Sequence, residues 1–136
     1  MANALYDAGR DAFANGNIDW VSDDIRCILV DAADYTVDLN NDDNLDDIAA
    51  GARVATMAAS LAGKSTSAGT CDATDVTFSS VTGDVSEALV IYLHTGTEST
   101  STLIAYIDTA TGLPVTPNGG DITVAWDSGS DKIFTL

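Results

Sequence analysis

The chain has 136 residues, of which 21 are acidic and 5 are basic, so its formal net charge is -16. This length fits one domain that buries a core without needing disulfides. The negative charge repels phosphate backbones and anionic lipid headgroups, which excludes binding to nucleic acid or to a membrane surface. An acidic exterior favours high solubility and contact with a basic partner surface.

The segment at the start, MANALYDAGR, has no basic region followed by an apolar one, and the chain has no apolar run of about 18 residues. We therefore expect no signal peptide, no transmembrane helix, and synthesis in the cytoplasm. Cys27 and Cys71 form neither a CxxC motif nor a metal-spaced set. Free thiols are the expectation in a reducing compartment, and a Cys27 to Cys71 disulfide is the alternative.

The N-terminal segment has the pattern of a short amphipathic helix. Asn3 can cap a helix over residues 4–14, in which Leu5 and Phe13 share a stripe and Tyr6 lies beside it. So short a helix needs a surface to lie on, either the chain's own sheet or a neighbouring subunit. We expect residues 1–20 to form an N-terminal arm or helix and residues 21–136 to form a single β-sandwich domain.

The rest of the chain has strand patterns separated by turns. They cover residues 25–30, a run from about residue 53, a weak strand with a loop within 59–72, and residues 76–78, 87–93, 103–107, 122–126 and 132–136. No βαβ alternation accompanies these seven or eight strands. The pattern predicts an all-β fold, an antiparallel β-sandwich or barrel with a short N-terminal helix or arm, and an edge strand at the end.

The most strongly patterned stretch runs from Glu87 to Asp127. Its first two strands, EALVIYL and LIAYID, are apolar on both faces, which is typical of strands that are covered on both sides. One face should build the core. The other should carry Val90, Tyr92, Ile104 and Tyr106, and a second sheet, the N-terminal segment or another subunit has to cover it.

No group of residues has the composition of a catalytic or cofactor site. The AGKS string at residues 62–65 lacks the first glycine of a phosphate-binding loop, and His94 is the only histidine. Because no nucleophile, base and orienting group can be named together, we expect a protein that is not an enzyme and has no cofactor. Trp20 and Trp126 are expected in the core or at an interface.

The acidic connection after residue 37 is a weak candidate for a metal site. Asp38, Asn40 and Asp42 have the spacing that opens an EF-hand loop, but the sixth position is Asp43 and the twelfth is Ala49. Irregular calcium binding by Asp42, Asp43, Asp46 and Asp47 therefore stands against a solvated acidic loop.

Several strings together resemble a family of small virion structural proteins of tailed bacteriophages. They are NALYDAGR near the start, GARVA at 51–55, DVTF at 75–78, EALVIY at 87–92, LIAYID at 103–108 and GLPVTPNGGDI at 112–122. The resemblance spans almost the whole chain. It implies a capsid decoration (cement) protein on the exterior of the virion head, whose partner is the major capsid protein.

A decoration protein has to bury apolar surface on its neighbours, usually around a symmetry axis, so we expect a homotrimer. The candidate partner-binding residues are Leu5, Tyr6, Phe13, Trp20, Val90, Tyr92, Ile104 and Tyr106. Two alternatives remain open: a tail, neck or head-fibre component, and a module that binds host-surface glycans.

Overall fold

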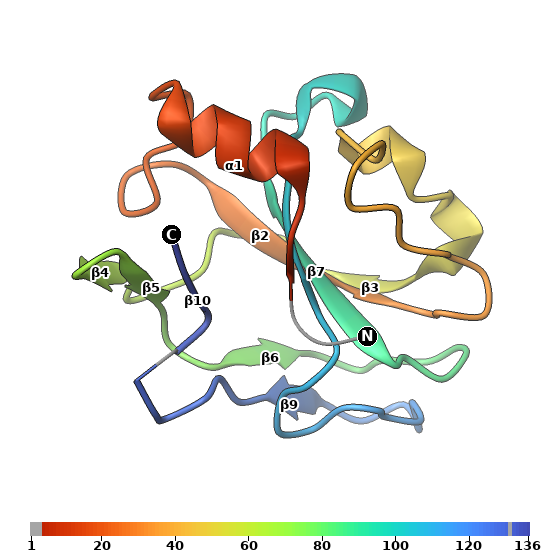
Figure 1. The fold of residues 1–136 in the computed structure, drawn as a ribbon. Coiled ribbons are helices and arrows are strands. Elements are labelled where there is room, and N and C mark those ends of the chain that lie inside the picture. The colour runs from red at the N-terminus through yellow and green to blue at the C-terminus, as the bar shows by residue number, and fades with distance from the viewer. Residues whose placement is uncertain (1–3, 131) are drawn as a thin grey trace.

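The computed structural model describes residues 4–130 and 132–136, which form antiparallel sheets of ten strands and one α-helix (Figure 1). The elements in chain order are β1 Ala4–Leu5, α1 Asp7–Ala14, β2 Ile25–Val30, β3 Arg53–Thr56, β4 Ser65–Ser67, β5 Thr70–Asp72, β6 Val76–Phe78, β7 Ala88–Leu93, β8 Leu103–Ile107, β9 Ile122–Val124 and β10 Phe134–Thr135. Three short 3-10 turns lie at η1 Leu45–Asp47, η2 Ala50–Ala52 and η3 Glu98–Thr100. The all-β prediction is confirmed. None of the helices in this part of the chain has the length and apolar character needed to cross a bilayer.

The largest sheet has the strand order β1-β8-β7-β2-β3. A second sheet has the order β10-β5-β4, and β6 pairs with β9 in a third. Of the predicted strand at 122–126, only Ile122–Val124 forms a strand, β9. It pairs with β6 and not with β7 or β8. The predicted edge strand at the end is β10, which is the terminal strand of its sheet.

Both faces of the five-stranded sheet are covered by the chain itself. On one face, Leu29, Leu89 and Ile91 belong to a core cluster that also contains Phe78, Ile122 and other residues of β6 and β9. On the opposite face, Ile28, Val90 and Tyr92 pack in a cluster with Tyr35, Leu45 and Ile48 of the long connection after β2. In Figure 1 the β6–β9 pair lies on one side of the central strands and the η1–η2 turns, in yellow, on the other. The connection that joins β2 to β3 is thus the cover of the second face.

The N-terminal segment belongs to this fold rather than standing apart from it. The helix begins at Asp7 and not at Ala4, because Ala4 and Leu5 pair with Tyr106 and Ala105 of β8. The Tyr6 N–H donates to the carbonyl of Ile104 at 2.9 Å. The described part of the predicted arm is therefore an edge strand and a helix packed on the central sheet.

A β-bulge in β8 decides which of its side chains share a face. Ile91 is opposite Ala105, but Tyr92 is opposite Leu103, so Ile104 is the extra residue. Leu103 consequently joins the cluster of Tyr106, and Ile104 joins the opposite cluster. The prediction that Ile104 and Tyr106 share a face is wrong, since a strict alternation does not survive an inserted residue.

Helix α1 crosses this bulge at very close range. A Cβ on Gly9 would lie 2.8 Å from both the Ile104 Cα and the Leu103 carbonyl oxygen. Only glycine permits this approach of helix to strand. The bulge and Gly9 therefore fix the position of α1 together.

Candidate functional site

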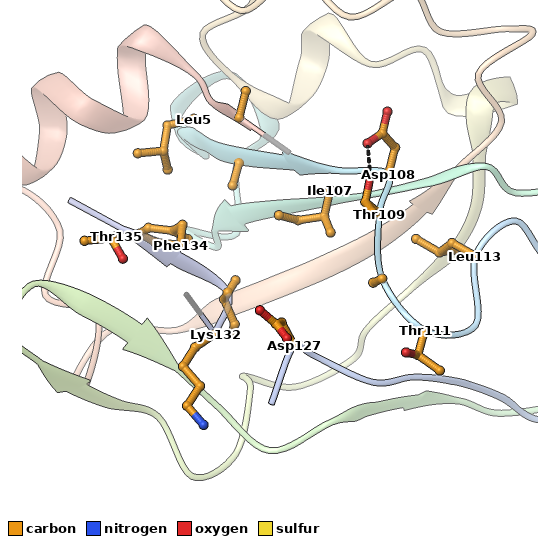
Figure 2. Close-up of a pocket in the computed structure, with 14 residues that line it drawn as sticks. Leu5, Ile107, Asp108, Thr109, Thr111, Leu113, Asp127, Lys132, Phe134 and Thr135 are labelled. Atoms are coloured by element: carbon orange, nitrogen blue, oxygen red, sulfur yellow. Dashed lines mark hydrogen bonds between the residues drawn. The ribbon is translucent and has the colours of Figure 1, made fainter. Parts of the chain in front are cut away.

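A groove lies between the edge of the largest sheet and the C-terminal strand (Figure 2). Its volume is about 760 Å³. The apolar part of its lining comes from β1, β8, β10 and the loop after β8, and consists of Ala4, Leu5, Ala105, Ile107, Ala110, Leu113, Ile133 and Phe134. The polar part consists of Asp108, Thr109, Thr111, Asp127, Lys132 and Thr135. An apolar floor with a polar border is the composition of a binding groove.

The two core residues at the groove's floor show how the fold makes it. Ile107 ends β8 and is buried, and Phe134 of β10 is 9% exposed with its ring centroid 5.3 Å from that of Trp20. Leu5 and Leu113 are only partly buried and pack against the same core cluster. The groove is therefore a place where the core reaches the surface between two sheets that do not meet.

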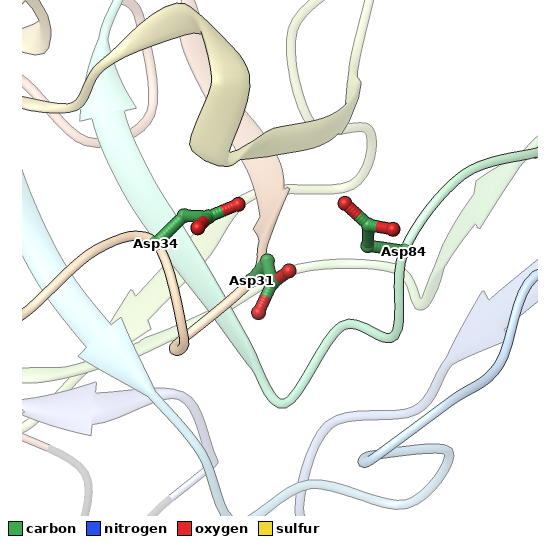
Figure 3. A group of neighbouring side chains, drawn as sticks. All are labelled: Asp31, Asp34 and Asp84. Atoms are coloured by element: carbon green, nitrogen blue, oxygen red, sulfur yellow. The ribbon is translucent and has the colours of Figure 1, made fainter.

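A second feature is a group of three carboxylates from two loops (Figure 3). Asp31 follows β2, Asp34 lies in the next turn, and Asp84 precedes β7; their carboxylate oxygens lie within 4.8 Å of one another. Asp31 is only 7% exposed, and its Oδ1 accepts a hydrogen bond from the Ala33 N–H at 2.8 Å. Hard oxygen ligands of this kind suit a divalent cation, although calcium usually takes six to eight of them.

The predicted calcium ligands have a different role. Asp42 Oδ2 accepts hydrogen bonds from the Tyr35 hydroxyl at 2.7 Å and from the Asp38 N–H at 2.9 Å. Asp47 Oδ2 accepts from the N–H groups of Asp43, at 2.7 Å, and Asn44, at 3.1 Å. Asp43 and Asp46 do not join them in a ligand cluster. Over residues 4–130 and 132–136, the only group of three possible ligands is Asp31, Asp34 and Asp84. The acidic loop is thus organised by hydrogen bonds to its own backbone.

The predicted partner-binding residues mostly lie inside the protein. Those at most 5% exposed are Tyr6, Trp20, Val90, Tyr92, Ile104 and Tyr106. The prediction that these six form a docking surface is wrong, because the chain's own elements cover both faces of the sheet. Leu5 and Phe13 are partly buried and pack against the core, and of the eight only Leu5 lines the groove.

Both tryptophans have structural roles. The Trp20 indole N–H donates to the Asp72 carbonyl at 3.0 Å, and the Trp126 indole N–H donates to the Thr74 carbonyl at 3.1 Å. They are 3% and 8% exposed. Because neither ring presents a face to solvent, neither can serve as a stacking platform for a sugar.

The remaining candidate groups are also bound within the chain. Lys64 of the AGKS string donates to the Asp23 carbonyl and to Ser60 Oγ, and burial lowers its pKa. The His94 ring lies edge-on to Tyr92, with the centroids 6.2 Å apart. Cys27 and Cys71 are buried free thiols, and burial raises the pKa of Cys71 to about 11 and that of Cys27 further. Such thiols are poor nucleophiles at neutral pH.

Sequence reasoning missed both the groove and the acidic trio. The groove combines the two ends of the described chain, and neither end has a pattern that shows where the other lies. Asp31 and Asp34 have a short spacing that could have drawn notice, but Asp84 is distant in sequence and comes near only through the pairing of β2 with β7.

No protein-family model matches the chain, and no curated protein shows a significant match to it.

Proposed function

We propose that this chain is a capsid decoration protein of a tailed bacteriophage, without enzymatic activity, that binds and stabilises the shell of the major capsid protein on the exterior of the head. The observation that carries the proposal is the set of six strings that resemble this class of virion protein. The proposed assembly is a homotrimer.

The positions of these strings in the fold support the proposal. EALVIY and LIAYID form the adjacent strands β7 and β8, NALYDAGR includes β1 and the start of α1, and DVTF includes β6. These segments build the central sheet and its cover, so the resemblance lies in the scaffold as a whole. A resemblance carried by scaffold segments is consistent with a role based on shape and surface rather than on a catalytic constellation.

The surface supports it as well. A net charge of -16 keeps the free protein soluble before assembly and attracts a basic partner surface. Both tryptophans are buried, so neither offers a sugar the exposed aromatic face that a glycan-binding module commonly uses. The described surface does offer one apolar recess, the groove between β1 and β10.

Binding to heads tests the proposal directly. Heads of the parent phage that lack the protein are mixed with increasing amounts of purified chain and examined by sedimentation and by cryo-electron microscopy. We expect saturable binding in many symmetry-related copies, trimeric density on the outer shell, and a higher temperature of head disruption. Density confined to the tail, the neck or a fibre, or no binding to heads, would refute the proposal.

A further inference from the structure

The groove is bounded on one side by an unpaired strand edge. β1 is the terminal strand of the five-stranded sheet. Tyr6 donates to Ile104 across the β1–β8 ladder, so Leu5, opposite Ala105, is at a position that is not hydrogen-bonded in this ladder. The N–H and C=O of Leu5 therefore point away from β8, and no described residue bonds either group.

The other side of the groove has a second unpaired edge. β10 is the terminal strand of its sheet, and Leu136 N–H donates to the Gly69 carbonyl at 2.9 Å. By the same alternation Thr135, opposite Thr70, directs its N–H and C=O away from β5. Thr135 and Leu5 both line the groove. Two strand edges thus border one apolar recess, and at each of them an outward N–H and an outward C=O have no partner among the described residues.

We propose that this groove binds an extended, cationic segment of the partner protein, which pairs as a β-strand with Leu5 of β1 and Thr135 of β10. Strand edges are templates for such pairing, in which backbone hydrogen bonds give affinity and alternate side chains fill pockets. The segment's inward side chains are apolar, because Ile107, Ile133 and Phe134 are buried beside the groove.

The negative charge of the protein favours a cationic occupant over a second copy of the chain. Lys or Arg on the outward positions of a partner segment are attracted to the net charge of -16, an attraction that a second copy with the same charge does not offer. The groove therefore favours a cationic segment, and the contacts of the proposed trimer are assigned to other surfaces. The lining of the groove contains two carboxylates, Asp108 and the exposed Asp127, and one lysine, Lys132, so its formal charge is negative as well. That the partner is the shell protein rests on the proposed function; the chemistry of the segment rests on the groove.

A blocked peptide, acetyl-KVTVKVTVK-amide, serves as the probe, because it alternates apolar residues with polar and basic ones. Its binding to the full chain is followed by amide chemical shifts. A second peptide of the same sequence has N-methyl groups on its three central residues, which removes backbone donors and keeps the side chains. Ala110→Phe fills the groove, and Ala59→Phe is the matched control on an exposed site outside it.

We expect the first peptide to shift the Leu5 and Thr135 amides in the natural chain and in Ala59→Phe. Binding should fall at least tenfold with the N-methylated peptide and with Ala110→Phe. Shifts elsewhere on the surface, equal binding of the two peptides, or no shift at millimolar peptide would overturn the inference. Protection of these amides that rises with protein concentration alone would assign the groove to a second copy and overturn the partner assignment.

Binding to heads separates this inference from the proposed function. Ala110→Phe that occupies heads as fully as the natural chain would refute the role of the groove and leave the decoration function standing. A natural chain that takes up the peptide but does not bind heads would refute the decoration function and leave the groove's specificity for cationic strands.

Discussion

Replacing Tyr35 with phenylalanine removes its hydroxyl group and tests what holds the connection after β2 on the second face of the sheet. Tyr35 O–H donates to Asp42 Oδ2 at 2.7 Å, and its oxygen lies 2.7 Å from that of Tyr6, so the Tyr6 hydroxyl is the donor to Tyr35. Tyr6 is fully buried, and Tyr35 is 5% exposed. This relay joins the N-terminal segment to the connection that covers the sheet.

The Tyr35→Phe change leaves the Tyr6 hydroxyl in the core without an acceptor, which costs about 1–3 kcal/mol. It also removes the hydrogen bond to the Asp42 carboxylate, and water can partly take the place of that donor. We expect unfolding free energy to fall by about 2–3 kcal/mol. Tyr6→Phe removes one neutral hydrogen bond without leaving an orphan donor, so its expected cost is about 1 kcal/mol.

The effects of the two changes on the unfolding free energy should not be additive. In Tyr6→Phe/Tyr35→Phe the orphaned hydroxyl is gone, so the double variant should be no less stable than Tyr35→Phe alone, a coupling of about 1 kcal/mol. Urea unfolding followed by tryptophan fluorescence measures all four proteins. Additive effects, or a Tyr35→Phe variant as stable as the natural chain, would refute the relay.

The same relay sets a dependence on alkaline pH. Burial raises the pKa of both Tyr6 and Tyr35 above the ordinary value. The unfolded tyrosines lose their protons near pH 10 while the folded ones keep them, so above about pH 10 the unfolded state binds fewer protons and stability falls as pH rises. The double variant should show a shallower decline, and an equally steep one would contradict this origin.

Three further changes test single packing and charge features by the same urea assay. Gly9→Ala should lose about 1–3 kcal/mol, because its Cβ would meet the β8 backbone, whereas Gly51→Ala, with open space around it, should change little; equal effects would contradict the close approach. Arg53→Met should lose about 1–3 kcal/mol, because Arg53 donates to the Leu45 and Ile48 carbonyls as well as to Glu98, and Glu98→Gln should lose much less. In buffer with a chelator, Asp84→Asn should raise stability by about 0.5 kcal/mol by removing repulsion within the acidic trio, and a loss would contradict that repulsion.

Apolar runs bounded by turn residues predicted the strands well, whether one face of the strand is buried, as in β6, or both faces are, as in β2 and β8. The runs at 25–30, 76–78 and 103–107 are strands at those bounds. The cover of the second face was harder to predict. Tyr35, Leu45 and Ile48 lie in a connection whose only regular structure is two 3-10 turns, and its acidic residues suggested a solvated loop. Hydrogen bonds from this loop to its own carboxylates let it carry apolar residues inward while its charges stay outside.

The bulge at Ile104 shows why one residue of the candidate surface was assigned to the wrong face. In a strand with no polar residue, every register is equally apolar, so the sequence has no signal for an inserted residue. The prediction that both faces of these strands are covered is nevertheless correct. Residues 31–52 cover one face, and the smaller sheets cover the other. Because both faces of the sheet are covered, the backbone groups that remain available for pairing lie along the outer edges of terminal strands. Leu5 and Thr135 are two such positions, and they border the same apolar groove. Contacts with another protein are therefore expected at the edges of these sheets rather than on their faces.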